Sequence, residues 1–231
     1  MKKIIICTII AAAFLSACGT TNTVTDIKSV AYKGMYDEKP LAILLMPPIN
    51  RSTNVEAKEY FHSTLNVPLA NAGYYVIPTF LSMEILKKES AYDAELFLDS
   101  PLNRFGEVFG ADLALFTIIH KWDKSHIAGS VDVSVEYILK STRTNEVLYT
   151  RIGDITYNTS VSSGTGGLIG VLADMAATAI NTAATRYIDV ARACNTYTFQ
   201  DLPAGKYSPS YGADANEFAG EKVFKATLSN K

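Results

Sequence analysis

Cysteine is scarce in this sequence, and its positions exclude a framework of internal disulfides. The 231 residues include three cysteines, Cys7, Cys18 and Cys194. The first two lie in an N-terminal segment that we expect to be removed or lipidated, so the remainder of the chain keeps Cys194 alone. A lone thiol in an oxidising compartment is safest when it is buried, and we expect Cys194 to be a core residue.

Metal-ligand patterns and a basic surface are also lacking. The three histidines stand at positions 62, 120 and 126, which matches no zinc-ligand spacing, and there is no HExxH motif. We expect His62 to lie exposed on a helix. With 21 Lys and Arg against 23 Asp and Glu, the net charge is −2 and the basic residues form no stripe. The sequence therefore predicts no metal, no cofactor and no nucleic-acid partner.

The glycine-rich stretch Ser163–Gly170 lacks the residues of a phosphate-binding loop. Its glycines are Gly164, Gly166, Gly167 and Gly170. A Walker loop requires Gly-Lys-Ser/Thr, and the dinucleotide fingerprint requires a third glycine where Ile169 stands. The alanine-rich segment 168–193 predicts one long helix with a thin profile. Two interpretations of that helix remain open: tight packing on a sheet, or a surface for self-association or for a partner.

The N-terminus, by contrast, contains the pattern of a bacterial lipoprotein. Lys2 and Lys3 precede the apolar run Ile4–Leu15, which is too short to span a bilayer and has the length of a signal-peptide core. The sequence LSAC then resembles a lipobox, which implies cleavage before Cys18 and acylation of that residue. Several acyl chains would hold the protein firmly, because each buried CH₂ contributes about 0.8 kcal/mol. Gly19, where aspartate would signal retention, implies export to the outer membrane, on either its periplasmic or its surface face.

The hydrophobic pattern predicts a single α/β domain behind a tether. We expect a signal peptide at 1–17, a lipidated cysteine and flexible tether at 18–38, the domain at 39–194 and an irregular tail at 195–231. Apolar runs predict buried strands near 41–46, 74–78 and 112–122, and alternation predicts a two-stranded hairpin near 131–158 with a bulge at Gly153 and Asp154. With the intervening helices, the pattern indicates a mixed sheet of about five strands flanked by helices.

One loop lies where α/β sheets often bind ligands. Arg51, Ser52 and Thr53 follow the first predicted strand, and Thr53 and Glu56 are spaced as a capping box that would start a helix near Asn54. A helix N-terminus at the carboxyl end of a strand favours an anion, and Arg51 adds positive charge, whereas Glu56 opposes it. This loop and the glycine-rich stretch are the candidate sites for a ligand or a partner.

Four ordered motifs carry a family resemblance. They are ILLMPPINRSTNVEAK, PLANAGYYVIP, FGADLALF and GTGGLIG, and they fall between Pro40 and Ala191. The sequence resembles an outer-membrane lipoprotein family catalogued as domain of unknown function number seven-nine-nine. The resemblance implies an α/β fold similar to the amino-terminal domain of TolB. It also implies a frequent genetic neighbourhood with lipoproteins similar to the curli secretion channel CsgG, and it supplies no catalytic residues.

We therefore expect a non-enzymatic, lipid-anchored accessory protein of an envelope secretion or transport assembly. Its expected partners are the outer membrane, through the lipid, other envelope proteins such as a CsgG-like lipoprotein, and further copies of itself in a homo-oligomer. The alternative is a periplasmic small-ligand-binding or enzymatic domain that uses the Arg51 loop or the Gly164–Gly170 loop. Asp112 and Asp174 could each act as an acid or base in principle, but neither has an evident partner.

Overall fold

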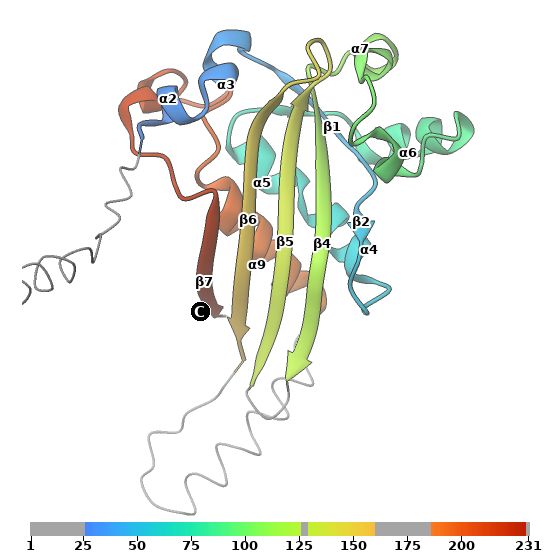
Figure 1. Cartoon of the computed structure of the whole chain (residues 1–231), viewed down its shortest axis with the longest axis vertical. Helices are drawn as coiled ribbons and strands as arrows, with labels where there is room; N and C mark the ends of the chain where they lie inside the picture. The colour runs from blue at the N-terminus through green and yellow to red at the C-terminus, as the bar shows by residue number, and fades with distance from the viewer. Residues whose placement is uncertain (1–25, 126–128, 160–185, 230–231) are drawn as a thin grey trace, which may run out of the picture.

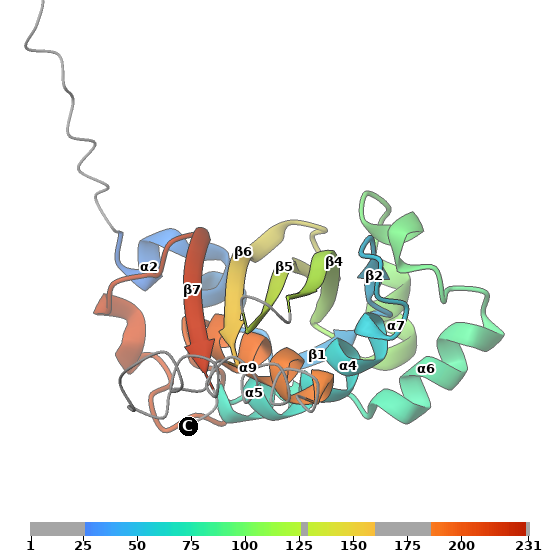
Figure 2. The ribbon, with the colours of Figure 1, turned by 90° about the horizontal axis from the view of Figure 1, so that it is seen from below.

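The computed structural model of the chain describes residues 26–125, 129–159 and 186–229 (Figure 1). Cys18, His126, Asp174 and the glycine-rich stretch lie outside these ranges. The described residues form one mixed α/β unit, built on a curved sheet with helices packed against it (Figures 1 and 2). The predicted fold class is therefore confirmed, although the sheet has seven strands and not about five.

The strands of this sheet run in the order β3-β1-β4-β5-β6-β7, and β2 pairs with β4 beyond the end of β1. Their bounds are β1 Ala42–Leu45, β2 Ile49–Asn50, β3 Tyr75–Val76, β4 Leu113–Ser125, β5 Ser130–Ser141, β6 Val147–Asn158 and β7 Val223–Ser229. The pairs among β4, β5 and β6 are antiparallel, whereas β1, β2 and β3 join by parallel pairing and β7 is parallel to β6.

Helices cover the two faces of the sheet unequally. Their bounds are α2 Lys28–Ala31, α3 Lys33–Glu38, α4 Ala57–Thr64, α5 Asn66–Asn71, α6 Thr79–Lys88, α7 Asn103–Phe109 and α9 Tyr187–Phe199, with 3₁₀ turns η1 Ala94–Phe97 and η2 Ala213–Asn216. On one face, α4, α5 and α9 pack over the length of the sheet (Figure 2). On the other face, α6, η1 and α7 cover only the part formed by β1 and the first half of β4.

This unequal cover explains the two hydrophobic patterns of the strands. Along β1, Ile43 and Leu45 enter the core beneath α4 and α9, while Leu44 enters the second core beneath α6. A strand buried on both faces is a continuous apolar run. Along β5, Val133 and Val135 enter the first core, and Ser134 between them is half-exposed.

The ends of the helices differ in detail from the capping pattern. Thr53 and Glu56 form no capping box: α4 begins at Ala57, and the amide of Glu56 donates to the Asn54 side chain (3.0 Å). The Glu56 carboxylate instead accepts a hydrogen bond from Tyr60 (2.5 Å). A break at Leu65 separates α4 from α5, since Pro68 has no amide hydrogen to donate to the carbonyl four residues before it.

The bulge expected at Gly153 and Asp154 is absent, because the register of β6 runs evenly through both residues. The irregularities lie instead between Leu139 and Lys140 on β5 and after Ile119 on β4. Gly153 has a packing reason: a Cβ at this position would lie 2.5 Å from the ring of Phe224 on β7. The glycine leaves room for that ring.

Ordered structure also extends beyond both expected domain boundaries. The segment expected to be a tether contains α2 and α3, and the segment expected to be an irregular tail contains the end of α9 and all of β7. These two segments, far apart in the chain, meet side by side (Figure 1). Lys28 on α2 forms an ion pair with Glu217 (2.9 Å), and Asp214 lies 3.9 Å away.

A second buried contact joins the same segments to β6. The Tyr32 hydroxyl donates to Asp201, whose other carboxylate oxygen accepts from the Gly220 amide (2.7 Å). Arg151 lies 3.8 Å from Asp201, and its guanidinium also donates to the carbonyl of Thr198 (2.8 Å). We call Tyr32, Arg151 and Asp201 the buried ion cluster. Burial raises the pKa of Tyr32, and the hydrogen bond to the Asp201 carboxylate raises it further.

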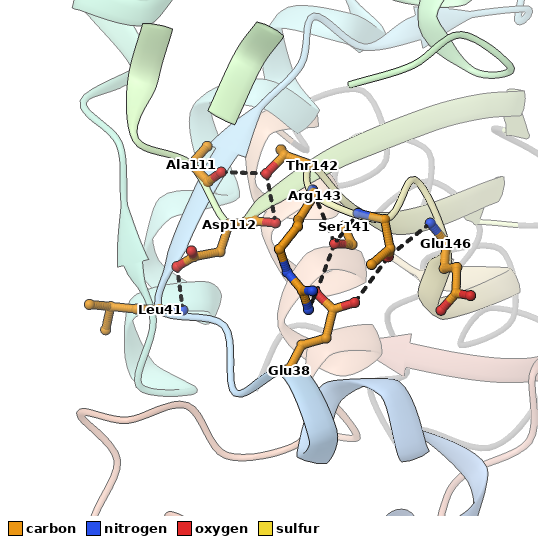
Figure 3. A network of polar contacts seen from close by, with 9 residues as sticks. Glu38, Leu41, Ala111, Asp112, Ser141, Thr142, Arg143 and Glu146 are labelled. Atoms are coloured by element: carbon orange, nitrogen blue, oxygen red, sulfur yellow. Dashed lines mark hydrogen bonds and ion pairs between the residues drawn. The ribbon is translucent and has the colours of Figure 1, made fainter. Parts of the chain in front are cut away.

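At the hairpin end of the sheet, a network of polar contacts fixes the turn between β5 and β6 (Figure 3). The carboxylate of Glu38 accepts from the hydroxyls of Ser141 (2.8 Å) and Thr144 (3.0 Å). Asp112 accepts the amides of Leu41 (2.8 Å) and Ala42 (2.9 Å), which ties the start of β1 to the start of β4. Asp112 is therefore engaged in holding strands together.

Candidate functional site

The predicted loop lies beside a pocket of about 330 Å³ at the carboxyl end of β1. Arg51, Ser52 and Thr53 follow β2 directly. The pocket is lined by residues of the β1–β2 connection, α4, α6 and the turn before η1; they are Pro47, Pro48, Ile49, Asn50, Lys58, Glu59, His62, Met83, Tyr92, Asp93, Ala94 and Glu95. Two of these lining residues, Asn50 and Glu95, form hydrogen bonds with Ser52 and Arg51 of the loop.

Arg51 is not free to hold an anion in this geometry. Its guanidinium donates to the carboxylate of Glu95 (2.6 Å), and its amide donates to the carbonyl of Ile119 on β4 (2.8 Å). Both side chains of the ion pair are about half-exposed, at 47% and 55%. The pair spans from the loop to η1 at the pocket, and it neutralises the positive charge that the sequence analysis assigned to a ligand.

The two residues after Arg51 shape the loop. The side chain of Asn50 accepts from the amide of Ser52 (3.0 Å) and from its hydroxyl (2.7 Å), which closes a tight turn. Thr53 is exposed. The loop is therefore braced by its own polar groups.

His62 does not lie exposed, and the expectation drawn from the sequence is wrong. This residue is buried at 9% exposure, lines the pocket, and its Nε2 has no hydrogen-bond partner among the described residues. Burial lowers the pKa of His62, while the negative charge of Glu59 and a backbone hydrogen bond with Leu45 oppose that shift. His62 is thus a neutral imidazole in the wall of the pocket. Ala57, Phe61 and Leu65, spaced four residues apart, form the fully buried face of α4, and His62 follows Phe61 beside that face.

The pocket wall carries charged side chains of both signs. Lys58 contributes one positive charge, while Glu59 and Asp93 contribute negative charges that Arg51 does not pair. In the described ranges, no group of three or more His, Cys, Asp or Glu side chains stands close enough to hold a metal ion. His120 is paired with Glu136 on β5 (2.9 Å) and is not one of the residues that line the pocket.

A second hollow, of about 630 Å³, lies on the same face of the sheet as α6, η1 and α7, beyond the part that these elements cover. We call this surface the open face. It is lined by Lys121, Asp132, Val133, Ser134, Asp154, Ile155, Thr156, Lys225, Ala226 and Thr227. The alternation of polar residues along 131–140 had indicated a wetter face on one strand. The contribution of β7 had no signal in the sequence, because the tail was expected to be irregular.

Cross-strand hydrogen bonds order the polar side chains of the open face. Ser134 donates to Asp154 (2.7 Å) and Thr156 donates to Asp132 (2.8 Å). Lys121 lies 4.0 Å from Asp132. The face is therefore an ordered pattern of carboxylate, hydroxyl and ammonium groups.

Comparison with known proteins identifies the family. A family model described as "Putative lipoprotein GNA1162-like" matches residues 30–206, which is more than half of the chain. The chain belongs to the GNA1162-like lipoprotein family. Membership indicates a membrane-anchored place in the cell envelope. None of the helices in the described ranges combines the length and the apolar character needed to cross a bilayer.

This GNA1162-like chain is similar in sequence to one named lipoprotein and in structure to two solved proteins. Putative lipoprotein NMB1124/NMB1162 of Neisseria meningitidis serogroup B is 28% identical over 160 residues, which cover 68% of this chain and 72% of the relative. The crystal structure of lipoprotein GNA1162 from Neisseria meningitidis is 24% identical and covers 63% of this chain and 99% of its own, with a TM-score of 0.47. The C-terminal domain of LpoB from Escherichia coli is 14% identical, covers 55% and 93%, and has a TM-score of 0.38. Neither structural likeness bears on function.

Proposed function

We propose that this protein is a lipid-anchored outer-membrane lipoprotein that acts without catalysis, as an accessory component of an envelope secretion or transport assembly. The anchor is the acylated Cys18, and the N-terminal pattern together with the lipoprotein family supports it. The working surface is the open face, through which the protein contacts another envelope protein. A CsgG-like lipoprotein and a second copy of this chain are the two partners that the sequence analysis anticipated.

The ordered chemistry of the open face is the observation that carries this proposal. Its carboxylates, Asp132 and Asp154, stand between Lys121 and Lys225, and neighbouring hydroxyls already orient both carboxylates. Ordered side chains lose little rotamer entropy on binding, so polar complementarity translates efficiently into affinity and specificity. The matching surface should present amide, hydroxyl and cationic groups.

Site-specific photo-crosslinking in intact cells tests this function. A photoreactive residue in place of Lys225, on the open face, should give a discrete product with an envelope protein. The same residue in place of Lys88, an exposed lysine of α6, is the matched control and should give none. Absence of a product at position 225, or the same products at both positions, would contradict the proposal.

Lipidation is tested separately. Labelled palmitate should be incorporated into the native chain and not into a Cys18→Ala variant, and the native protein should fractionate with the outer membrane. A native chain that carries no label, or that is recovered free of membrane, would remove the anchor from the proposed function.

The pocket beside Arg51 supports a second candidate function, the binding of a small periplasmic ligand. Its specific support is the neutral, buried His62 in a wall that also carries charged groups. A library of envelope metabolites should then raise the unfolding temperature of the native protein, and His62→Asn should abolish the rise. Arg51→Ala, which opens the rim by freeing Glu95, is the companion variant. No rise with any compound would leave the accessory function alone.

A further inference from the structure

The point where the described chain begins is fixed to one short segment of the C-terminal part. Ile27 forms an isolated antiparallel bridge with Phe218. Next to it, the amide of Lys28 donates to the carbonyl of Glu217 (2.8 Å), and the side chains of the same two residues form an ion pair (2.9 Å). Residues 26 and 27 and the segment around Phe218 therefore lie at the same place on the molecule.

Large apolar side chains are exposed at this point. Phe218 is 75% exposed, and Val30 on α2 is 59% exposed. Two further aromatic residues in the loop before η2 are also exposed, Tyr207 at 67% and Tyr211 at 44%. Single exposed apolar residues are ordinary on a protein surface. Phe218 and Val30 are distinguished by their place, because both adjoin the residues through which the N-terminal stretch enters the fold.

The length of that stretch limits how far this point can stand from a membrane. Only seven residues, 19–25, separate Cys18 from Asp26. Eight residue steps span at most about 28 Å when fully extended. The start of α2 is therefore held within about 28 Å of the lipid headgroups beside an acylated Cys18.

We propose that Val30 and Phe218 form a membrane-docking edge, which lies in the headgroup region of the lipid leaflet that holds the anchor. The proposal rests on the lipidation of Cys18. Aromatic side chains favour the boundary between headgroups and acyl chains, and a second membrane contact would fix the orientation of a protein that one lipidated residue alone leaves unfixed. Asp26 and Glu217 are the acidic neighbours of the edge, and Glu217 is paired with Lys28. The edge therefore fits zwitterionic phosphatidylethanolamine, whose ammonium group faces carboxylates, and not an anionic lipid surface.

The test uses the full lipidated protein reconstituted into phosphatidylethanolamine and phosphatidylcholine vesicles whose acyl chains carry bromine, which quenches tryptophan by contact. Phe218→Trp places the reporter in the docking edge. Phe80→Trp is the matched control, because Phe80 is 83% exposed on α6, at the opposite side of the molecule (Figure 2). The native Trp122 is 3% exposed and adds the same background to both variants.

We expect Phe218→Trp emission to shift to the blue and to be lost in brominated vesicles, and Phe80→Trp emission to match that in unbrominated vesicles. Adding anionic phosphatidylglycerol should not increase the quenching. Lipidated protein with no quenching at position 218, or with equal quenching at both positions, would overturn the docking edge and leave the lipid anchor standing. A native chain that incorporates no palmitate would overturn both.

Discussion

Replacing Asp201 with alanine removes the centre of the buried ion cluster, and the structure allows its cost to be estimated. Asp201 is 9% exposed and Arg151 is 6% exposed. The substitution leaves the Arg151 charge without its counter-ion and deprives the Tyr32 hydroxyl and the Gly220 amide of their acceptor. Removing one partner of a buried ion pair costs about 3–5 kcal/mol. Arg151 keeps the carbonyls of Thr198 and Glu221 as acceptors, which favours the lower part of that range.

We therefore expect Asp201→Ala to lower the free energy of unfolding by about 3–4 kcal/mol, which corresponds to a fall in melting temperature of about 6–16 °C for a chain of this size. Equilibrium unfolding in urea, followed by circular dichroism, measures the change. Asp37→Ala is the matched control, because Asp37 forms an exposed pair with Lys33 on α3 and should cost less than about 1 kcal/mol. A difference between the two variants within about 0.5 kcal/mol would refute the role given to the cluster.

Three further predictions concern the core. Gly153→Ala should destabilise the fold by about 1–3 kcal/mol in the same urea assay, because the new Cβ would meet the Phe224 ring. Adding Phe224→Leu to the same chain should recover part of the lost stability. No change in stability for Gly153→Ala would contradict the close packing of β7 on β6. Burial raises the pKa of Tyr137 and Tyr149 well above 10.0. Above pH 10 the unfolded state therefore loses these protons before the folded state does, and the free energy of unfolding should fall by about 1.4 kcal/mol per pH unit for each residue. A free energy of unfolding that stays constant from pH 9 to about pH 11 would count against their burial. Burial also raises the pKa of Cys194 to about 12. A thiol reagent should therefore modify Cys194 only at the rate of global unfolding. Fast modification of the native protein would contradict the packing of α9 against the sheet.

The strands of the sheet's centre were predictable because their environments are uniform along their length. The run from Leu41 to Met46 is apolar because β1 is buried on both faces, and the alternation in β5 reflects one buried and one half-exposed face. In both cases a local pattern of residues repeats a local pattern of burial. Cys194 is also buried as expected, because a lone thiol in an oxidising compartment is safest in the core.

The elements that were missed are those stabilised by partners distant in the chain. α2 has only four residues and no side-chain cap, and it is held by Lys28 pairing with Glu217, 189 positions away. β7 buries one large side chain, Phe224, and depends on parallel pairing with β6. Such short segments have too few residues to show a period. His62 was misplaced for a related reason: it lines a pocket together with the turn before η1, which lies about thirty residues later in the chain.

These tertiary contacts also determine how the two proposed surfaces are placed in the molecule. α3 packs at the hairpin end of β6, where Gly34 lies against Leu148, so the start of the described chain is at that end (Figure 1). Along β5, Asp132 lies nine residues from Ser141, a distance of about 30 Å in an extended strand. The membrane-docking edge and the centre of the open face are thus separated by most of the length of the sheet. A partner bound at the open face would not collide with the lipid headgroups. The buried ion cluster joins Tyr32, which follows α2, and Asp201 in the C-terminal segment to Arg151 on β6, so it ties the proposed docking edge to a strand of the open face.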